Sequence, residues 1–210
     1  MYYTLVNIGY LISLVNLVLY LKSFHAYGKA FRFFRWYLGI IFSIQIISFI
    51  MMKLYINNLF VSHFYFIGQF VLLGLFYESL MIAKRQKDFV KWGIGMGLLA
   101  LGVQYAFDPK QFFQFNLFEI AVTSLLLVVF AVLHLYNMLT EKKEFYYINL
   151  GIIIYLLGST VLFFVGNLTA LLNPKLSLLT WTLNAGLIII YQLFILLEWK
   201  KSFSKKAIQK

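Results

Sequence analysis

The chain has 210 residues, of which 62% are hydrophobic and only 12% charged, and its formal net charge is +11. A soluble domain carries about 25% charged residues, so a soluble core of this size could not bury so much apolar surface, and many side chains are expected to face lipid. Cysteine is absent, which excludes disulfides, thiolate metal sites and thiol nucleophiles.

Seven apolar runs follow one another along the chain, each close to the ~20 residues with which a helix crosses ~30 Å of hydrocarbon. They cover residues 2–21, 36–56, 60–82, 90–107, 115–139, 145–167 and 177–198. Membrane strands would alternate apolar and polar residues, and these runs do not. The sequence predicts an all-α membrane protein, a single seven-transmembrane-helix bundle over residues 1–210 without a soluble catalytic module. The first run has neither the flanking basic segment nor the cleavage motif of a signal peptide.

Lysine and arginine are distributed unevenly over the segments between these runs. If the segments alternate sides, one side carries only Lys53, Lys110 and Lys175. All other basic residues fall on the opposite side, in segments 22–35, 83–91 and 140–144 and in the tail after residue 198. Because basic loops stay in the cytoplasm, we predict that the N-terminus is outside and the C-terminus cytoplasmic.

The basic face predicts two kinds of partner. Anionic lipids of the cytoplasmic leaflet would be attracted to it, and a cytoplasmic protein could bind there. Nucleic acid is excluded as a partner because the basic residues are scattered over short loops. Only the segment "FRFFRW" (31–36) interleaves basic and aromatic residues, and at a membrane edge that pattern is typical of an interfacial segment.

The third run, "SHFYFIGQFVLLGLFYESLM" (62–81), is almost wholly apolar but contains His63, Gln69 and Glu78. A rise of 1.5 Å per residue puts His63 ~5 Å inside the outer boundary, Gln69 at ~14 Å and Glu78 at ~27 Å. Ionisable groups in membrane spans face the bundle interior. We therefore expect one polar face of this helix to point inward.

Polar residues of the other runs sort by depth into two clusters. The outer cluster is the predicted ligand-binding site and comprises His63, Gln69, Gln104, Asn116, Glu119 and Asn184, with Gln45 at its floor. The inner polar cluster comprises Glu78, His134, Asn137, Asn149 and Glu198. The alternatives are packing hydrogen bonds between helices and, for the ionisable groups, wet positions at the membrane interface.

The fourth run carries Gly93 and Gly97 as a GxxxG pair, which predicts close helix packing. No HExxH, GxSxG, Walker A or GxGxxG motif occurs, so no catalytic residue is assigned. The three histidines lie at three depths, and no metal or other cofactor is predicted. A retinal protein is excluded because the seventh run has no lysine for a Schiff base.

Three stretches resemble a family of small uncharacterised bacterial seven-span membrane proteins without an assigned function. They are "NNLFVSHFYFIGQF" (57–70), "FYYINLGIIIYLLGSTVLFFVGN" (145–167) and "LLTWTLNAGLIIIYQLF" (178–194). The family pattern falls on His63, Gln69, Asn149, Gly151, Tyr155, Gly158, Trp181 and Asn184. Gln69 stands where the family more often has glutamate, and Asn184 where it has histidine. The resemblance implies a bacterial inner membrane location and no activity.

The leading functional expectation is a non-enzymatic, receptor-like protein or accessory sensor with an outward-facing polar pocket for a small molecule or lipid. The alternative is a carrier of small solutes or lipids, with the two clusters as outer and inner gates and the binding site near the midplane. An intramembrane enzyme is a third class, which would need a carboxylate or histidine pair in contact.

The orientation can be tested with single cysteines, because the chain has no cysteine of its own. A cysteine at Asn173 or Lys110 should react with an impermeant thiol reagent added from outside, and one at Lys87 or Lys205 should not. The opposite labelling pattern would reverse the topology and exchange the two clusters.

Overall fold

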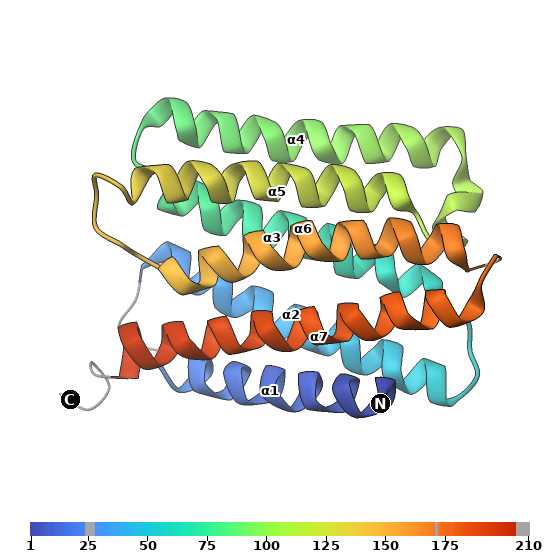
Figure 1. The fold of residues 1–210 in the computed structure, drawn as a ribbon. Coiled ribbons are helices and arrows are strands. Elements are labelled where there is room, and N and C mark those ends of the chain that lie inside the picture. The colour runs from blue at the N-terminus through green and yellow to red at the C-terminus, as the bar shows by residue number, and fades with distance from the viewer. Residues whose placement is uncertain (24–27, 171, 205–210) are drawn as a thin grey trace. The chain divides into compact units, whose positions relative to one another are not determined.

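The computed structural model describes residues 1–23, 28–170 and 172–204, and all regular structure in these ranges is helical (Figure 1). The α-helices are α1 (Tyr2–Lys22), α2 (Lys29–Lys53), α3 (Leu59–Leu80), α4 (Lys84–Phe107), α5 (Leu117–Asn137), α6 (Tyr146–Thr169) and α7 (Pro174–Glu198). A short 3₁₀ helix, η1 (Pro109–Phe113), follows α4, and a π-helical turn, η2 (Trp199–Phe203), continues α7. The predicted all-α class is confirmed, with seven α-helices in the described part of the chain.

Two predicted boundaries are wrong. α2 begins at Lys29 instead of residue 36, and α4 begins at Lys84 instead of residue 90. Hydropathy marks where apolar residues begin, but lysine and arginine are good helix formers, so both helices extend through the basic segments. Parts of the predicted basic segments 22–35 and 83–91 therefore form the first turns of α2 and α4. Lys205, Lys206 and Lys210, which the topology prediction counted in the tail, lie outside the described residues.

Six of the α-helices in the described ranges are long and apolar enough to cross a membrane, and α4 is the exception. α4 is long enough, with 24 residues, but it includes four glycines and several basic residues in its first turns. Glycine has no side chain to contribute to hydropathy. α4 therefore has the length of a span with a weaker apolar signal.

The chain divides into two compact units. Unit 1 consists of Met1–Ala26 and Ala131–Lys210, and so contains α1, the last turns of α5, α6 and α7. Unit 2 is Tyr27–Phe130 and contains α2, α3, α4, η1 and the larger part of α5.

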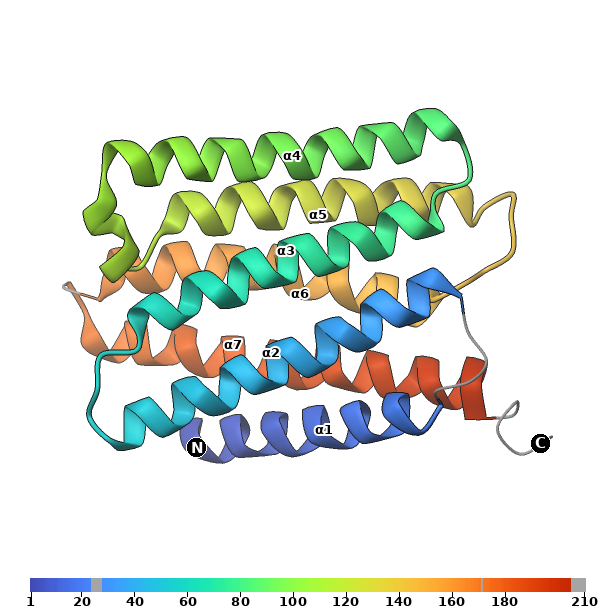
Figure 2. The same cartoon turned by 180° about the vertical axis from the view of Figure 1, so that it is seen from behind.

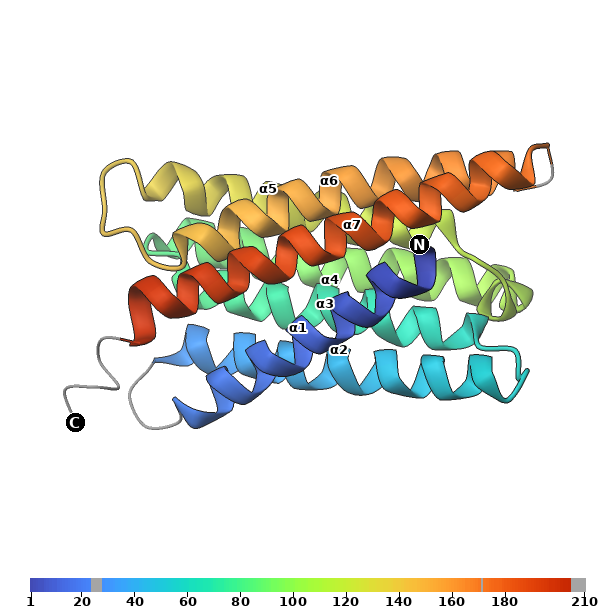
Figure 3. The same ribbon diagram turned by 60° about the horizontal axis from the view of Figure 1, so that its bottom comes forward.

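In unit 1, α6 and α7 lie side by side and antiparallel, and α1 packs along α7 (Figures 1 and 3). Glycine lets the first pair approach closely, since a Cβ added at Gly151 would lie 2.8 Å from Cβ of Phe194. α1 is joined to α7 by the buried amide of Asn16, whose Nδ2 donates to the backbone oxygen and to Oε1 of Gln192, each at 2.8 Å.

Glu198, the last residue of α7, supplies the cap that the start of α6 lacks. α6 begins after Phe145, whose backbone is in the left-handed region (φ 54°) and whose side chain makes no capping hydrogen bond. Oε2 of Glu198 accepts from the backbone N–H of Tyr147 at 2.8 Å, and Oε1 accepts from the Ser202 hydroxyl in η2. The carboxylate, only 1% exposed, thus satisfies a free helix N–H.

In unit 2, α2 and α3 form a helical hairpin, and α4 packs against α3 (Figure 2). The hairpin is tied by Asn58, whose Nδ2 donates to the backbone oxygen and hydroxyl of Ser48 at 3.0 and 2.9 Å. On α4, a Cβ added at Gly97 would lie 2.8 Å from Cζ of Phe70 and 3.1 Å from Leu126. The close packing predicted for the GxxxG segment is therefore confirmed at Gly97.

Gly97→Leu should destabilise the protein more than Gly95→Leu. Gly97 is buried between Phe70 and Leu126, whereas a Cβ at Gly95 would meet nothing within 4 Å. Overpacking a buried site costs ~1–3 kcal/mol. Thermal unfolding in detergent should show a lower midpoint for Gly97→Leu than for Gly95→Leu, which is a control on the same helix. Equal midpoints would mean that α4 does not pack as described.

Candidate ligand site around His63

Glu119 is a carboxylate with no exposed surface in the first turn of α5. Asn116 precedes the helix, and its Oδ1 accepts from the backbone N–H of Glu119 at 3.1 Å, as an N-capping residue does. Three residues after the cap, Glu119 lies at the positive end of the helix dipole, which favours a negative charge. The local sequence N-x-x-E thus fixes the start of α5 and the position of the carboxylate.

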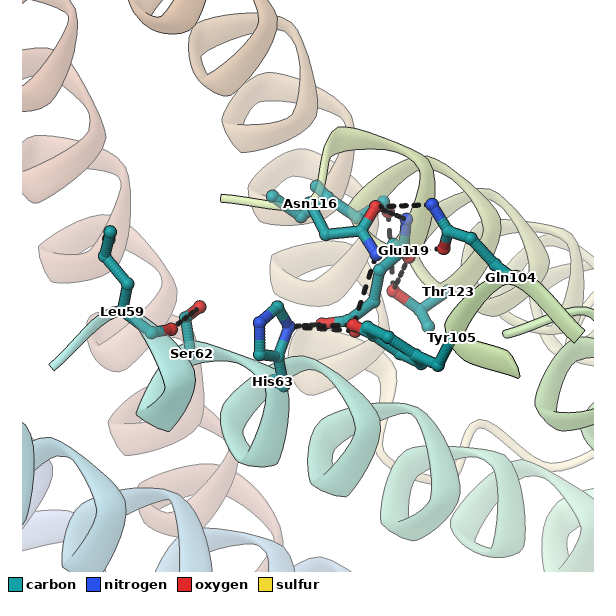
Figure 4. A network of polar contacts seen from close by, with 9 residues as sticks. Leu59, Ser62, His63, Gln104, Tyr105, Asn116, Glu119 and Thr123 are labelled. Atoms are coloured by element: carbon teal, nitrogen blue, oxygen red, sulfur yellow. Dashed lines mark hydrogen bonds and ion pairs between the residues drawn. The ribbon is translucent and has the colours of Figure 1, made fainter. Parts of the chain in front are cut away.

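His63, in the second turn of α3, is the first partner of this carboxylate. Its Nδ1 lies 3.1 Å from Oε2 and 3.3 Å from Oε1 of Glu119, and the imidazole is 2% exposed (Figure 4). His63 and Glu119, which depth placed together in the outer cluster, are thus in direct contact. A carboxylate removed from water needs hydrogen-bond donors, and His63 supplies one of them.

Tyr105, in the last turn of α4, is the second partner and was missed by the sequence analysis. Its hydroxyl donates to Oε2 of Glu119 and lies 2.9 Å from Nδ1 of His63. The same hydroxyl accepts from Nδ2 of Asn116 at 3.1 Å. Tyr105 is half-buried, so it connects the buried pair with the surface of unit 2. The only signal in the sequence is that Tyr105 directly follows Gln104 in an otherwise apolar run.

Gln104 and Asn116 form a reciprocal amide pair beside this cluster. Nδ2 of Asn116 donates to Oε1 of Gln104 at 2.9 Å, and Nε2 of Gln104 donates back to Oδ1 of Asn116 at 3.2 Å. With its contacts to Tyr105 and to the Glu119 backbone, Asn116 uses its full hydrogen-bonding capacity. The amide pair joins the end of α4 to the start of α5 and holds Tyr105 in place.

These contacts show which ring nitrogen of His63 carries a proton toward Glu119. The Tyr105 hydroxyl gives its proton to Glu119 and accepts from Asn116, so Nδ1 of His63 faces two acceptor oxygens. Nδ1 is then a protonated nitrogen that donates toward these oxygens. Nε2 is buried and has no hydrogen-bond partner among the described residues. A buried polar atom without a partner is uncommon and marks a place where a ligand can bind.

Phe112 of η1 covers the imidazole. The two rings are stacked, with centroids 5.2 Å apart and an interplanar angle of 27°. Phe60, Phe64 and Tyr105 surround Phe112 with ring centroids at 6.2–6.4 Å. η1 therefore places an aromatic cover over the polar cluster, a feature that the sequence analysis assigned to a plain loop.

Two members of the predicted site, Gln69 and Asn184, and the predicted floor residue Gln45 have no contact in this network. Gln69 lies deeper in α3, is 2% exposed, and its Oε1 has no hydrogen-bond partner in the described chain. The Oε1 of Gln45 on α2 has the same status. Asn184 belongs to α7 in unit 1, and the network contacts all lie within unit 2. Its predicted place near His63 stays a prediction.

The members of the predicted inner cluster bind separate partners. Glu78 lies 3.5 Å from Nζ of Lys91 in an ion pair within unit 2. In unit 1, three of the cluster residues anchor backbone groups. Nε2 of His134 contacts the Glu144 carbonyl at 2.9 Å, Nδ2 of Asn149 donates to the Ala131 carbonyl at 3.1 Å, and Glu198 caps α6. These contacts give His134, Asn149 and Glu198 structural roles that depth alone did not predict.

Across residues 1–23, 28–170 and 172–204, no three histidine, aspartate or glutamate side chains come together as a metal site would require. No family model matches the chain, and comparisons with curated proteins and with solved structures give no significant match. The resemblance described under Sequence analysis therefore stays a prediction.

Tyr105→Phe should lower the free energy of unfolding by ~1–3 kcal/mol, because it removes a hydroxyl that binds a buried carboxylate. Tyr136→Phe deletes the same atom from a side chain that is 68% exposed and should have an effect within ~0.5 kcal/mol. Denaturant unfolding in detergent measures both. Combined with Glu119→Gln, Tyr105→Phe should also be non-additive by ~0.5–3 kcal/mol. Additive effects would show that the hydroxyl and the carboxylate do not interact.

Proposed function

We propose that this chain is a seven-span membrane protein of receptor-like or accessory sensor function, with a ligand site around His63 near the outer surface. The observation that carries the proposal is the buried Nε2 of His63, which has no partner in the described chain while Nδ1 is held by Glu119 and Tyr105. Here one nitrogen orients the ring and the other is left for a ligand.

The membrane part of the proposal rests on the helices. Six α-helices have the length and composition of spans, and we assign α4 as the seventh because its 24 residues exceed the ~20 that are needed. α2 and α4 begin in basic residues, and basic segments stay in the cytoplasm. With seven spans, we therefore assign these two helix ends and the tail to the cytoplasmic side and the N-terminus to the outside. The basic ends would then meet anionic lipids or a cytoplasmic partner.

A carrier is the second candidate, and one observation favours it. Below the His63 network, Gln69 and Gln45 present buried Oε1 atoms that have no hydrogen-bond partner within the described ranges. Gln69 lies six residues beyond His63, or ~9 Å further along α3. Acceptors at successive depths are what a solute would need to pass inward from the outer site.

An enzyme remains the least supported class, although the structure contains the His–carboxylate pair that such an enzyme would need. In catalytic pairs of this kind, the second ring nitrogen takes a proton from a nucleophile. No hydroxyl in the described chain is hydrogen-bonded to Nε2 of His63, so no serine, threonine or tyrosine is placed for activation. We therefore prefer binding to catalysis.

A thermal-stability screen of water-soluble metabolites against the purified protein tests the proposed site. We expect at least one compound to stabilise the wild type and Ser43→Ala, but not His63→Asn or Glu119→Gln. Ser43 is a suitable control because its hydroxyl binds only within α2, to the Gly39 carbonyl at 2.9 Å. If every stabilising compound acts equally on all four proteins, there is no ligand site at His63.

The same compound then separates receptor from carrier. In proteoliposomes, a receptor should bind it at the outer face without net accumulation in the lumen. Accumulation that requires the protein and is lost in Glu119→Gln would establish the carrier instead.

A further inference from the structure

We infer that the ligand of this site carries a primary ammonium group, which donates an N–H to Nε2 of His63 while Glu119 balances its charge. The inference rests on the proposed function and names the chemical class of the ligand. It uses three properties of unit 2: the hydrogen-bonding polarity of the free nitrogen, the charge of the cluster, and the aromatic rings around it.

Because Nε2 of His63 needs a hydrogen-bond donor, a ligand that offers only acceptors is excluded. Nδ1 of His63 faces oxygens of Glu119 and Tyr105, so Nδ1 carries a proton. We infer that the ring is neutral, which leaves Nε2 as an acceptor. An anion at Nε2 would meet a lone pair and would also approach the buried carboxylate. A group with an N–H or O–H satisfies the free acceptor.

The charge of the cluster favours a cation over a neutral donor. Of the five side chains that form the network, only Glu119 carries a formal charge, and none is lysine or arginine. With His63 neutral, as inferred above, the donors that hold Glu119 are an uncharged hydroxyl and an uncharged imidazole N–H, so its negative charge is not cancelled. A charge-assisted hydrogen bond from an ammonium is stronger than one from an alcohol.

The aromatic rings complete the site. Phe112 stacks on the imidazole at 5.2 Å, and Phe60 and Phe64 lie at 6.4 and 6.2 Å from Phe112. Aromatic faces attract ammonium groups by cation–π interaction and also accept the apolar part of an amine. η1, only five residues long, carries Phe112, and its displacement would open the imidazole to the ligand. The amine could come from solution or from a lipid headgroup such as phosphatidylethanolamine.

The test uses the full chain in phosphatidylcholine nanodiscs and an amine-free buffer, with ¹⁵N-labelled histidine so that NMR reports on Nε2 of His63. Three probes are compared: butylammonium, tetramethylammonium and butyrate. Butylammonium should shift the Nε2 resonance and raise the unfolding temperature. Tetramethylammonium has the charge but no N–H, and butyrate has the opposite charge, so neither should shift Nε2.

Two variants locate the effect. His63→Asn keeps a donor near the position of Nδ1 for Glu119 but removes Nε2, so the protein should stay folded by circular dichroism. Its affinity for butylammonium should fall about tenfold or more, and Glu119→Gln should weaken binding to a similar extent. Ser43→Ala should bind butylammonium as the wild type does.

The lipid composition distinguishes the two sources of the amine. If phosphatidylethanolamine in the discs shifts Nε2 without any added probe, the ligand is the headgroup. If only butylammonium does so, it is a free amine. Both outcomes support the inference.

Three outcomes would overturn the inference: a shift produced by butyrate, equal binding of tetramethylammonium and butylammonium, or no response to any amine. The proposed function would survive them if the metabolite screen still gave a compound that depends on His63. It would fail only if no such compound existed.

Discussion

A carboxylate that is removed from water must be given partners, and this requirement organises one end of unit 2. Glu119 has no exposed surface, and three helices each place one group around it: the imidazole of His63 from α3, the hydroxyl of Tyr105 from α4 and the N-capped first turn of α5. Leaving a buried group without its hydrogen-bond partner typically costs ~1–3 kcal/mol, and more when the group is charged. The ends of the three helices are therefore held together by the needs of one side chain.

Some buried polar groups bind the backbone, and others bind side chains. In unit 1, Asn149 donates to the backbone carbonyl of Ala131, and Glu198 accepts from the backbone N–H of Tyr147 at the start of α6. Such contacts satisfy backbone groups, although Oδ1 of Asn16 and of Asn184 in the same unit have no hydrogen-bond partner among the described residues. In unit 2, the contacts of His63 satisfy one side of a ring and leave the other side bare. Burial alone does not distinguish these two kinds of polar residue. They are distinguished by whether each hydrogen-bonding atom has a partner.

The sequence predicts the helices and places His63 and Glu119 in one outer cluster, because apolar length and depth along a helix depend only on residue spacing. It does not predict the helix starts at Lys29 and Lys84, because hydropathy does not detect basic residues that are helical. Tyr105 was missed because a tyrosine near the end of a span also suits the membrane interface. Phe112 was missed because its place over His63 depends on the path of η1, and loop paths follow from tertiary contacts.

Glu198 also has a consequence for how α6 and α7 can slide past one another. Leucine-rich surfaces in lipid carry little information about axial register, since lipid tails are as apolar as the side chains. A carboxylate at the end of α7 is disfavoured by the dipole of its own helix and favoured by the first turn of α6. A shift of one residue, ~1.5 Å, would separate it from the Tyr147 N–H. Glu198 thus fixes one axial register of α6 and α7, among several registers whose apolar packing would be nearly equal.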